Sequence, residues 1–283
     1  MVLLYGVLKG AREICKKKAL ETCTSIEVLL IYSLVAFLLV LPDAPRVGGM
    51  EPRFYLYIAM KSFVIFIAWI CSFKAIKHLP LSLYGVLDLS RVLFATLLGV
   101  TVVGEVMGPL NVCGLVLVGG GLLMLKFKPF GKNRSITEES VSPQIVVIAL
   151  ISCLLNAVSA LMDKILTRDV SSAQLQFWYM LFLCIFYGVY ALITHSNVNF
   201  KRAITNKWIW ILSIMFVIAD RALFVANSMQ ESQIMVMTLI KQSGCIVTIL
   251  AGKFIFKEKN TGYKFFCAGI IILGIVLGTV SVM

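Results

Sequence analysis

The sequence predicts an all-α integral membrane protein with ten transmembrane helices, arranged as two inverted repeats of five helices. Sixty per cent of its 283 residues are hydrophobic and only 14% are charged, far fewer than the roughly 25% charged residues of a soluble domain. The mean hydropathy is +0.94. The apolar runs are about 20 residues long, which is enough to cross a hydrocarbon core of about 30 Å as helices. The third observation is an internal repeat.

Charged residues, prolines or glycines end each apolar run. Ser142 and Pro143 suggest a helix N-cap followed by a first-turn proline. The expected membrane spans are 1–19, 26–41, 54–73, 81–103, 107–125, 143–162, 174–194, 207–229, 233–255 and 261–282.

The repeat becomes visible when the chain is shifted along itself by 153 positions. Glu105 then falls on Glu258, Gly121 on Gly274 and Asp88 on Lys241. The predicted units are a first repeat over 1–125, a polar connection over 126–142 and a second repeat over 143–283. Because five spans is an odd number, the second half starts from the opposite side of the membrane, and such inverted repeats bind substrate at their interface.

The basic residues predict orientation rather than a nucleic-acid partner. The net charge is +12, but the cations are scattered through short segments between apolar runs and do not alternate with aromatic residues. The connections after the odd-numbered spans hold sixteen basic residues, while the opposite face holds Arg46, Arg53, Lys164 and Arg168. The positive-inside rule therefore predicts that the odd connections are cytoplasmic and that both termini are outside.

The eight cysteines occur singly, without a CxxC pair or a histidine at metal-ligand spacing. We therefore expect small core residues, and neither a metal site nor a cofactor. An intramembrane enzyme is disfavoured, because the sequence has no HExxH, no Gly-x-Ser-x-Gly and no histidine inside an apolar run. No catalytic residue is expected.

Charged residues inside the apolar runs are the main functional signal. Each one near the centre of a membrane helix costs on the order of 2.5–3.5 kcal/mol, so such residues normally face the bundle interior and form pairs. Asp88 and Arg91 lie three residues apart on one helix side, one turn after Tyr84. The predicted substrate-binding residues are Arg12, Glu13, Tyr84, Asp88, Arg91, Asn156, Asp220, Arg221, Lys241 and Gln242.

Two polar stripes with helical spacing support this prediction. The first comprises Lys9, Arg12, Glu13 and Lys16, at i, i+3, i+4 and i+7. The second comprises Ser152, Asn156, Ser159 and Asp163, in the first span of the second half. An alternative is a buried charge network that only fixes helix registry, because buried ion pairs are weak evidence for stability or function.

Ten spans in two halves, the Leu79-Pro-Leu-Ser82 start of the fourth span, the terminal Glu105 and Glu258 and the glycine-rich final spans are similar to the EamA-like branch of the drug/metabolite transporter superfamily. The resemblance implies a ten-helix carrier of small metabolites, often amino acids, with a cavity lined by spans 1, 3, 4, 6, 8 and 9. Many members have proline near the middle of spans 4 and 9, which this chain lacks. Relatives usually begin and end in the cytoplasm, against the loop-charge prediction, so the orientation stays open.

The predicted function is alternating-access transport of a small polar metabolite, such as an amino acid or a related zwitterion or anion, across the inner or plasma membrane. Arg91, Arg221 or Lys241 would hold a carboxylate or phosphate of the substrate. Asp88 or Asp220 would hold an amine. Glu105 and Glu258 are interpreted as capping or interface residues. The expected partners are the small-molecule substrate and the lipid bilayer, and a homodimer is left open. The alternatives are a lipid-headgroup flippase and a non-transporting membrane scaffold.

Overall fold

A computed structural model describes residues 2–103, 108–127, 142–195, 198–228, 244–258 and 261–280. All regular structure in these ranges is helical. The first half contains α1 (Val2–Leu20), α2 (Ser25–Val40), the 3-10 helix η1 (Leu41–Arg46), α3 (Pro52–His78), α4 (Leu81–Asp88), α5 (Ser90–Leu98), the π-helical turn η2 (Gly99–Val103) and α6 (Pro109–Phe127). The second half contains α7 (Pro143–Leu166), α8 (Ser172–Ile193), α9 (Phe200–Thr205), α10 (Lys207–Ser228), α12 (Gly244–Phe254) and α13 (Thr261–Val280).

Six helical stretches are long and apolar enough to cross a membrane. They are Ser25–Arg46, Pro52–His78, Leu81–Leu98, Pro143–Leu166, Ser172–Ile193 and Lys207–Val225. The described residues therefore establish a multi-pass helical protein, but not the predicted number of ten spans. Helix α1 has the length of a span, but its charged residues lower its mean hydropathy. The predicted span 233–255 is described only over α12, because the residues before Gly244 lie outside the described ranges.

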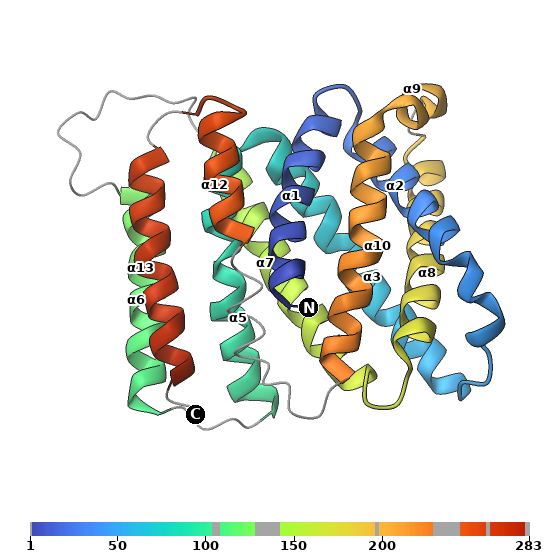
Figure 1. Ribbon diagram of the computed structural model, residues 1–283, viewed down its shortest axis with the longest axis horizontal. Coiled ribbons are helices and arrows are strands. Elements are labelled where there is room, and N and C mark those ends of the chain that lie inside the picture. Colours follow the sequence, from blue (N-terminus) through green and yellow to red (C-terminus); the bar gives the residue numbers. More distant parts are fainter. Residues whose placement is uncertain are drawn as a thin grey trace.

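The helices of the two halves pack in matching pairs (Figure 1). Helix α1 packs on α10 of the second half, and α7 packs in the same way on α3 of the first half. The contacts of α2 with α10 and of α1 with α12 are likewise matched by those of α8 with α3 and of α7 with α5. Helices α6 and α13 form one edge of the bundle, and α2 and α8 lie toward the other edge. Each of these helix contacts therefore has an equivalent in which the two halves have exchanged roles.

Helix α4 and helix α5 form one predicted span that is interrupted at Leu89. The amide of Leu89 donates to the Val86 carbonyl at 3.1 Å, and the amide of Val92 donates to the Leu89 carbonyl at 3.1 Å. These i to i−3 bonds tighten the turn between Asp88 and Ser90. The sequence did not predict this interruption, since no glycine or proline marks it.

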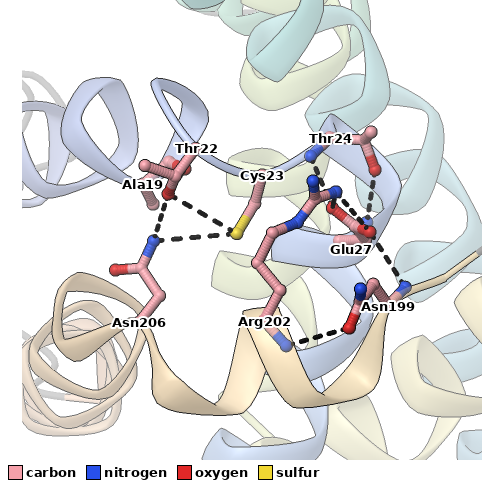
Figure 2. A network of polar contacts seen from close by, with 8 residues as sticks. All are labelled: Ala19, Thr22, Cys23, Thr24, Glu27, Asn199, Arg202 and Asn206. Atoms are coloured by element: carbon pink, nitrogen blue, oxygen red, sulfur yellow. Dashed lines mark hydrogen bonds and ion pairs between the residues drawn. The ribbon is translucent and has the colours of Figure 1, made fainter.

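The buried carboxylate of Glu27 connects the start of α2 to α9. We call this contact region the α2 junction, and it comprises Thr24, Glu27, Asn199, Arg202 and Asn206. Thr24 and Glu27 form a capping box at the start of α2. Glu27 is fully buried, and its carboxylate also accepts from the Asn199 amide at 2.9 Å and from Arg202 Nη2 at 2.7 Å (Figure 2). The Glu27 carboxylate raises the pKa of Arg202 by accepting its hydrogen bonds, so this pair stays ionised.

The start of α8 carries a neutral counterpart, which we call the α8 junction: Val47, Gly48, Ser171, Gln174 and Trp178. Ser171 and Gln174 form the second capping box. Gln174 Nε2 donates to the Gly48 carbonyl at 3.0 Å, and Trp178 Nε1 donates to the Val47 carbonyl at 3.1 Å. Each junction therefore fixes the second helix of one half to the segment that precedes the third helix of the other half.

Candidate functional site

A cavity of about 120 Å³ lies among α1, α3, α5, α7 and α10. Helices α2 and α8 each add a tyrosine to its wall, Tyr32 and Tyr179. The remaining aromatic wall comes from Tyr5, Trp69, Phe216 and Phe224. The charged lining residues are Lys9, Arg12, Glu13, Lys16, Lys61, Arg91, Asp163 and Asp220. Both halves of the chain thus supply charged groups to one cavity.

The polar stripe of α1 faces this cavity as its spacing predicted. Lys9, Arg12, Glu13 and Lys16 are each no more than 8% exposed. They also line the cavity together. A helix places residues at these spacings on one side, so a single helix supplies half of the charged lining. Lys16 Nζ lies 2.8 Å from Glu13 Oε1 within the stripe.

Two ion pairs cross between the halves at equivalent helix contacts. Arg12 Nη1 of α1 lies 3.2 Å from Asp220 Oδ1 of α10. Lys61 Nζ of α3 lies 2.9 Å from Asp163 Oδ1 of α7. The Lys61 side chain is 2% exposed, and its ammonium lies 3.3 Å from the centre of the Tyr179 ring, a close cation–π contact. Separation of either helix pair would break its ion pair.

Asp88 joins two cations beside the interrupted turn at Leu89. Its carboxylate lies 2.5 Å from Lys9 Nζ and 2.5 Å from Arg91 Nε. Asp88 itself lines a smaller space against α12, together with Glu13 and Tyr84, while both of its cationic partners line the main cavity. Tyr84 lies within hydrogen-bonding distance of Ser72, with the two oxygens 2.7 Å apart, and Ser72 lines the cavity. Asp88 and Arg91 are therefore part of a larger network.

Glycines allow α1 and α12 to touch beside this network. A Cβ atom on Gly10 would lie 2.7 Å from the Gly244 carbonyl oxygen, and one on Gly244 would lie 2.7 Å from the Gly6 carbonyl oxygen. Any larger residue at either position would force the helices apart, because the atoms that it meets include backbone.

Two buried polar atoms of α1 have no hydrogen-bond partner among the described residues. They are Nε of Arg12 and Oε2 of Glu13. Buried polar groups are normally hydrogen-bonded, and an unsatisfied one costs about 1–3 kcal/mol. Both residues line the cavity.

Of the ten predicted site residues, five line the main cavity or belong to its ion pairs across the halves: Arg12, Glu13, Arg91, Asn156 and Asp220. Asp88 and Tyr84 lie directly behind them. Arg221 does not reach the cavity, since its guanidinium contacts Asp43 and Gln176. Lys241 and Gln242 lie outside the described residues.

The prediction omitted Lys61 and Asp163 from the site, although the sequence carried a signal for each. Lys61 is a lysine in the middle of an otherwise apolar run, and Asp163 ends the polar stripe of the sixth predicted span. The aromatic wall carried no such signal, because tyrosines and phenylalanines occur throughout the apolar runs.

Glu258 has the capping role predicted for it. It accepts hydrogen bonds from the Leu81 amide at 2.5 Å and from the Ser82 amide at 3.2 Å, at the start of α4. A carboxylate from the second half therefore caps a helix of the first half. Lys264 Nζ lies 3.5 Å from the same carboxylate. Glu105 lies outside the described residues.

Comparison with known proteins identifies the family. The sequence profile of the EamA-like transporter family matches residues 1–127 and again residues 144–280. A solved structure, described as "Crystal structure of protein", aligns with 99% of this chain and 95% of its own chain, at a TM-score of 0.66 and 12% sequence identity. At that identity the likeness shows the fold alone. No curated protein matches. Because the two matched segments cover most of the sequence, this multi-pass membrane protein belongs to the EamA-like transporter family, whose members are transporters of the drug/metabolite type.

Proposed function

We propose that this protein is a secondary transporter of the cell membrane that moves a small charged metabolite through the cavity between its halves by alternating access. The proposal includes ten membrane spans in two inverted repeats. The observation that carries it is the pair of buried ion pairs, Arg12–Asp220 and Lys61–Asp163, each of which joins one half to the other. Both halves must part on alternate sides for a solute to pass.

The chemistry of exchange follows from these pairs. A charged group of the solute can replace one member of an ion pair, so that no charge is left without a partner in the low-dielectric interior. Binding of the solute then loosens the contact between the halves, and its release restores that contact. A network that only fixed helix registry would need no cavity at its centre.

A flippase is a weaker fit to this site. The cavity has a volume of about 120 Å³ and is lined by charged and aromatic side chains from seven helices. A lipid headgroup with its attached chains would need a path open to the bilayer. Scrambling of fluorescent phospholipid in proteoliposomes, without uptake of any soluble metabolite, would support the flippase instead.

The test is uptake or counterflow of a panel of labelled amino acids, organic acids, sugars and polyamines in proteoliposomes. The variants Arg12→Ala and Asp163→Ala each remove one member of a pair that joins the halves, and we expect at least a tenfold loss of uptake. The matched control is Arg53→Ala, whose ion pair with Glu51 is about 60% exposed. Wild-type uptake of one solute that survives in both cavity variants, with normal size-exclusion profiles, would overturn the site.

A further inference from the structure

The charges around the cavity divide into two clusters of different balance. The cation-rich cluster comprises Lys9, Glu13, Lys16, Asp88 and Arg91, with three cations and two carboxylates. The balanced cluster comprises Arg12, Lys61, Asp163 and Asp220, with two of each. Among the described residues, the cavity network therefore carries one excess positive charge, and the excess lies in the cation-rich cluster.

This excess charge is buried. In the cation-rich cluster, the side chains of Lys9 and Lys16 are at most 10% exposed, and that of Arg91 is 21% exposed. A buried charge without a counterion is costly and normally obtains one. All three cations line the main cavity. Among the described residues no further carboxylate balances this charge, and an anionic group in the cavity would do so.

The balanced cluster leaves no equivalent place for a cation. The Asp163 carboxylate already holds the ammonium of Lys61, which also covers the face of the Tyr179 ring at 3.3 Å. Asp220 already holds Arg12, whose guanidinium carbon lies 5.1 Å from the centre of the Phe216 ring. An additional ammonium group here would restore the excess positive charge that an anion had removed.

The size of the cavity limits the body of the ligand. An engineered protein cavity of about 150 Å³ takes up benzene, which has six heavy atoms, so about 120 Å³ suits a molecule of up to about six heavy atoms. Trp69, Tyr32 and Phe216 form mutual ring contacts with centroids 5.1–5.4 Å apart, and all three line the cavity. This wall suits an apolar body.

Building on the proposed function, we propose that the ligand is a small organic monoanion, a monocarboxylate of up to about six heavy atoms. Its carboxylate pairs with the cation-rich cluster, chiefly Arg91 and Lys16, and its hydrocarbon part lies on the aromatic wall. A zwitterion of the same size is disfavoured, because its ammonium group would restore the excess positive charge that its carboxylate had removed.

The test is binding at pH 7.5 of four compounds with one carbon skeleton, measured by isothermal titration calorimetry on purified protein. Butyrate is the anion, 2-aminobutyrate the zwitterion, butyramide the neutral analogue and butylamine the cation. We expect butyrate to bind at least tenfold more tightly than the other three. Equal or tighter binding of 2-aminobutyrate or butylamine would overturn the proposal.

Two substitutions should shift butyrate affinity in opposite directions. Arg91→Gln removes the excess positive charge, so affinity should fall at least tenfold. Glu13→Gln adds a positive charge to the cluster, so affinity for butyrate should rise, and the dianion succinate should begin to bind. The control Arg53→Gln should leave both unchanged. The expected rise in butyrate affinity for Glu13→Gln also distinguishes a binding role from a structural one, because a misfolded variant would not bind more tightly.

The outcomes separate the two proposals. If none of the four compounds binds while the panel reveals transport of a sugar, a polyamine or a zwitterion, the charge argument fails and the transporter remains. If no solute of either set binds or moves, the proposed function itself fails.

Discussion

The α2 junction and the α8 junction occupy equivalent places in the two halves, yet different chemistry holds them. Both begin with a capping box at the second helix of a half, and both reach to the other half. At α2 the group that contacts the other half is a fully buried carboxylate paired with a guanidinium, whereas at α8 it is a half-buried side-chain amide that donates to a carbonyl. Charge-assisted hydrogen bonds are roughly twice as strong as neutral ones.

A repeated architecture therefore does not make the two ends of the helix bundle equally stable. In an alternating-access transporter, each junction must loosen when its own end of the bundle opens. The α2 junction is then the harder end to open, so we expect the resting protein to favour the conformation in which that end is closed.

Glu27→Ala should have the largest effect. The substitution removes the acceptor for two backbone amides and for Arg202 Nη2, so we expect the free energy of unfolding to fall by about 2–4 kcal/mol. Unfolding in sodium dodecyl sulfate, followed by tryptophan fluorescence, measures it. Glu27→Gln keeps an acceptor for the capping box and should lose clearly less stability. An equal loss in both variants would contradict a special role of the charge.

Arg202→Ala should loosen the α2 junction without removing the capping box. Cys23 provides a native reporter, since it is buried at 4% exposure and its Sγ accepts from Asn206 Nδ2 at 3.7 Å. We expect maleimide to label Cys23 about tenfold faster in the variant, because local opening becomes more frequent. The matched control is Lys201→Ala, the exposed neighbour on α9. Labelling that stays at the wild-type rate would show that Arg202 does not hold this end.

Gln174→Ala should have a smaller effect than Glu27→Ala. It removes the hydrogen bond that the Gln174 side chain accepts from the Ser171 amide and the one that it donates to the Gly48 carbonyl, which together stabilise the fold by about 0.5–1.5 kcal/mol. The same denaturant titration measures it. A loss as large as that of Glu27→Ala would mean that the two junctions are equally strong, and the comparison would fail.

Added salt should have the smallest effect. Because the side chain of Arg202 is 47% exposed, its attraction to Glu27 is open to screening. Raising sodium chloride from low to high concentration should therefore lower the melting temperature of the wild type slightly more than that of Glu27→Gln. A difference of the opposite sign would indicate that screening acts elsewhere in the molecule.

The sequence predicted most helix bounds because charge, proline and capping residues mark them. The start of α7 after Ser142 and the interior face of the α1 stripe both follow from local patterns. The interruption at Leu89 did not, since it depends on the packing of the surrounding helices. The capping box of Thr24 and Glu27 is readable as a motif, but its partner Arg202 is 175 residues away. Single-sequence patterns carry no information on such distant pairs.

Asp220 and Arg221 show where the prediction of the site reached its limit. The sequence placed both residues at membrane depth, and both were expected in one cluster. Consecutive residues on a helix are turned by about 100° from each other, because a turn contains 3.6 residues. Asp220 therefore faces Arg12 in the cavity, while Arg221 faces Asp43 and Gln176. Depth alone could not distinguish the two directions.

The paired charges of the cavity also constrain how this transporter can evolve. A single substitution at Arg12, Asp220, Lys61 or Asp163 removes the ion-pair partner of a buried charge. A lineage that changes its solute must therefore alter both members of a pair, or first acquire a compensating residue. Descendants with new specificities should accordingly carry correlated replacements on helices from opposite halves.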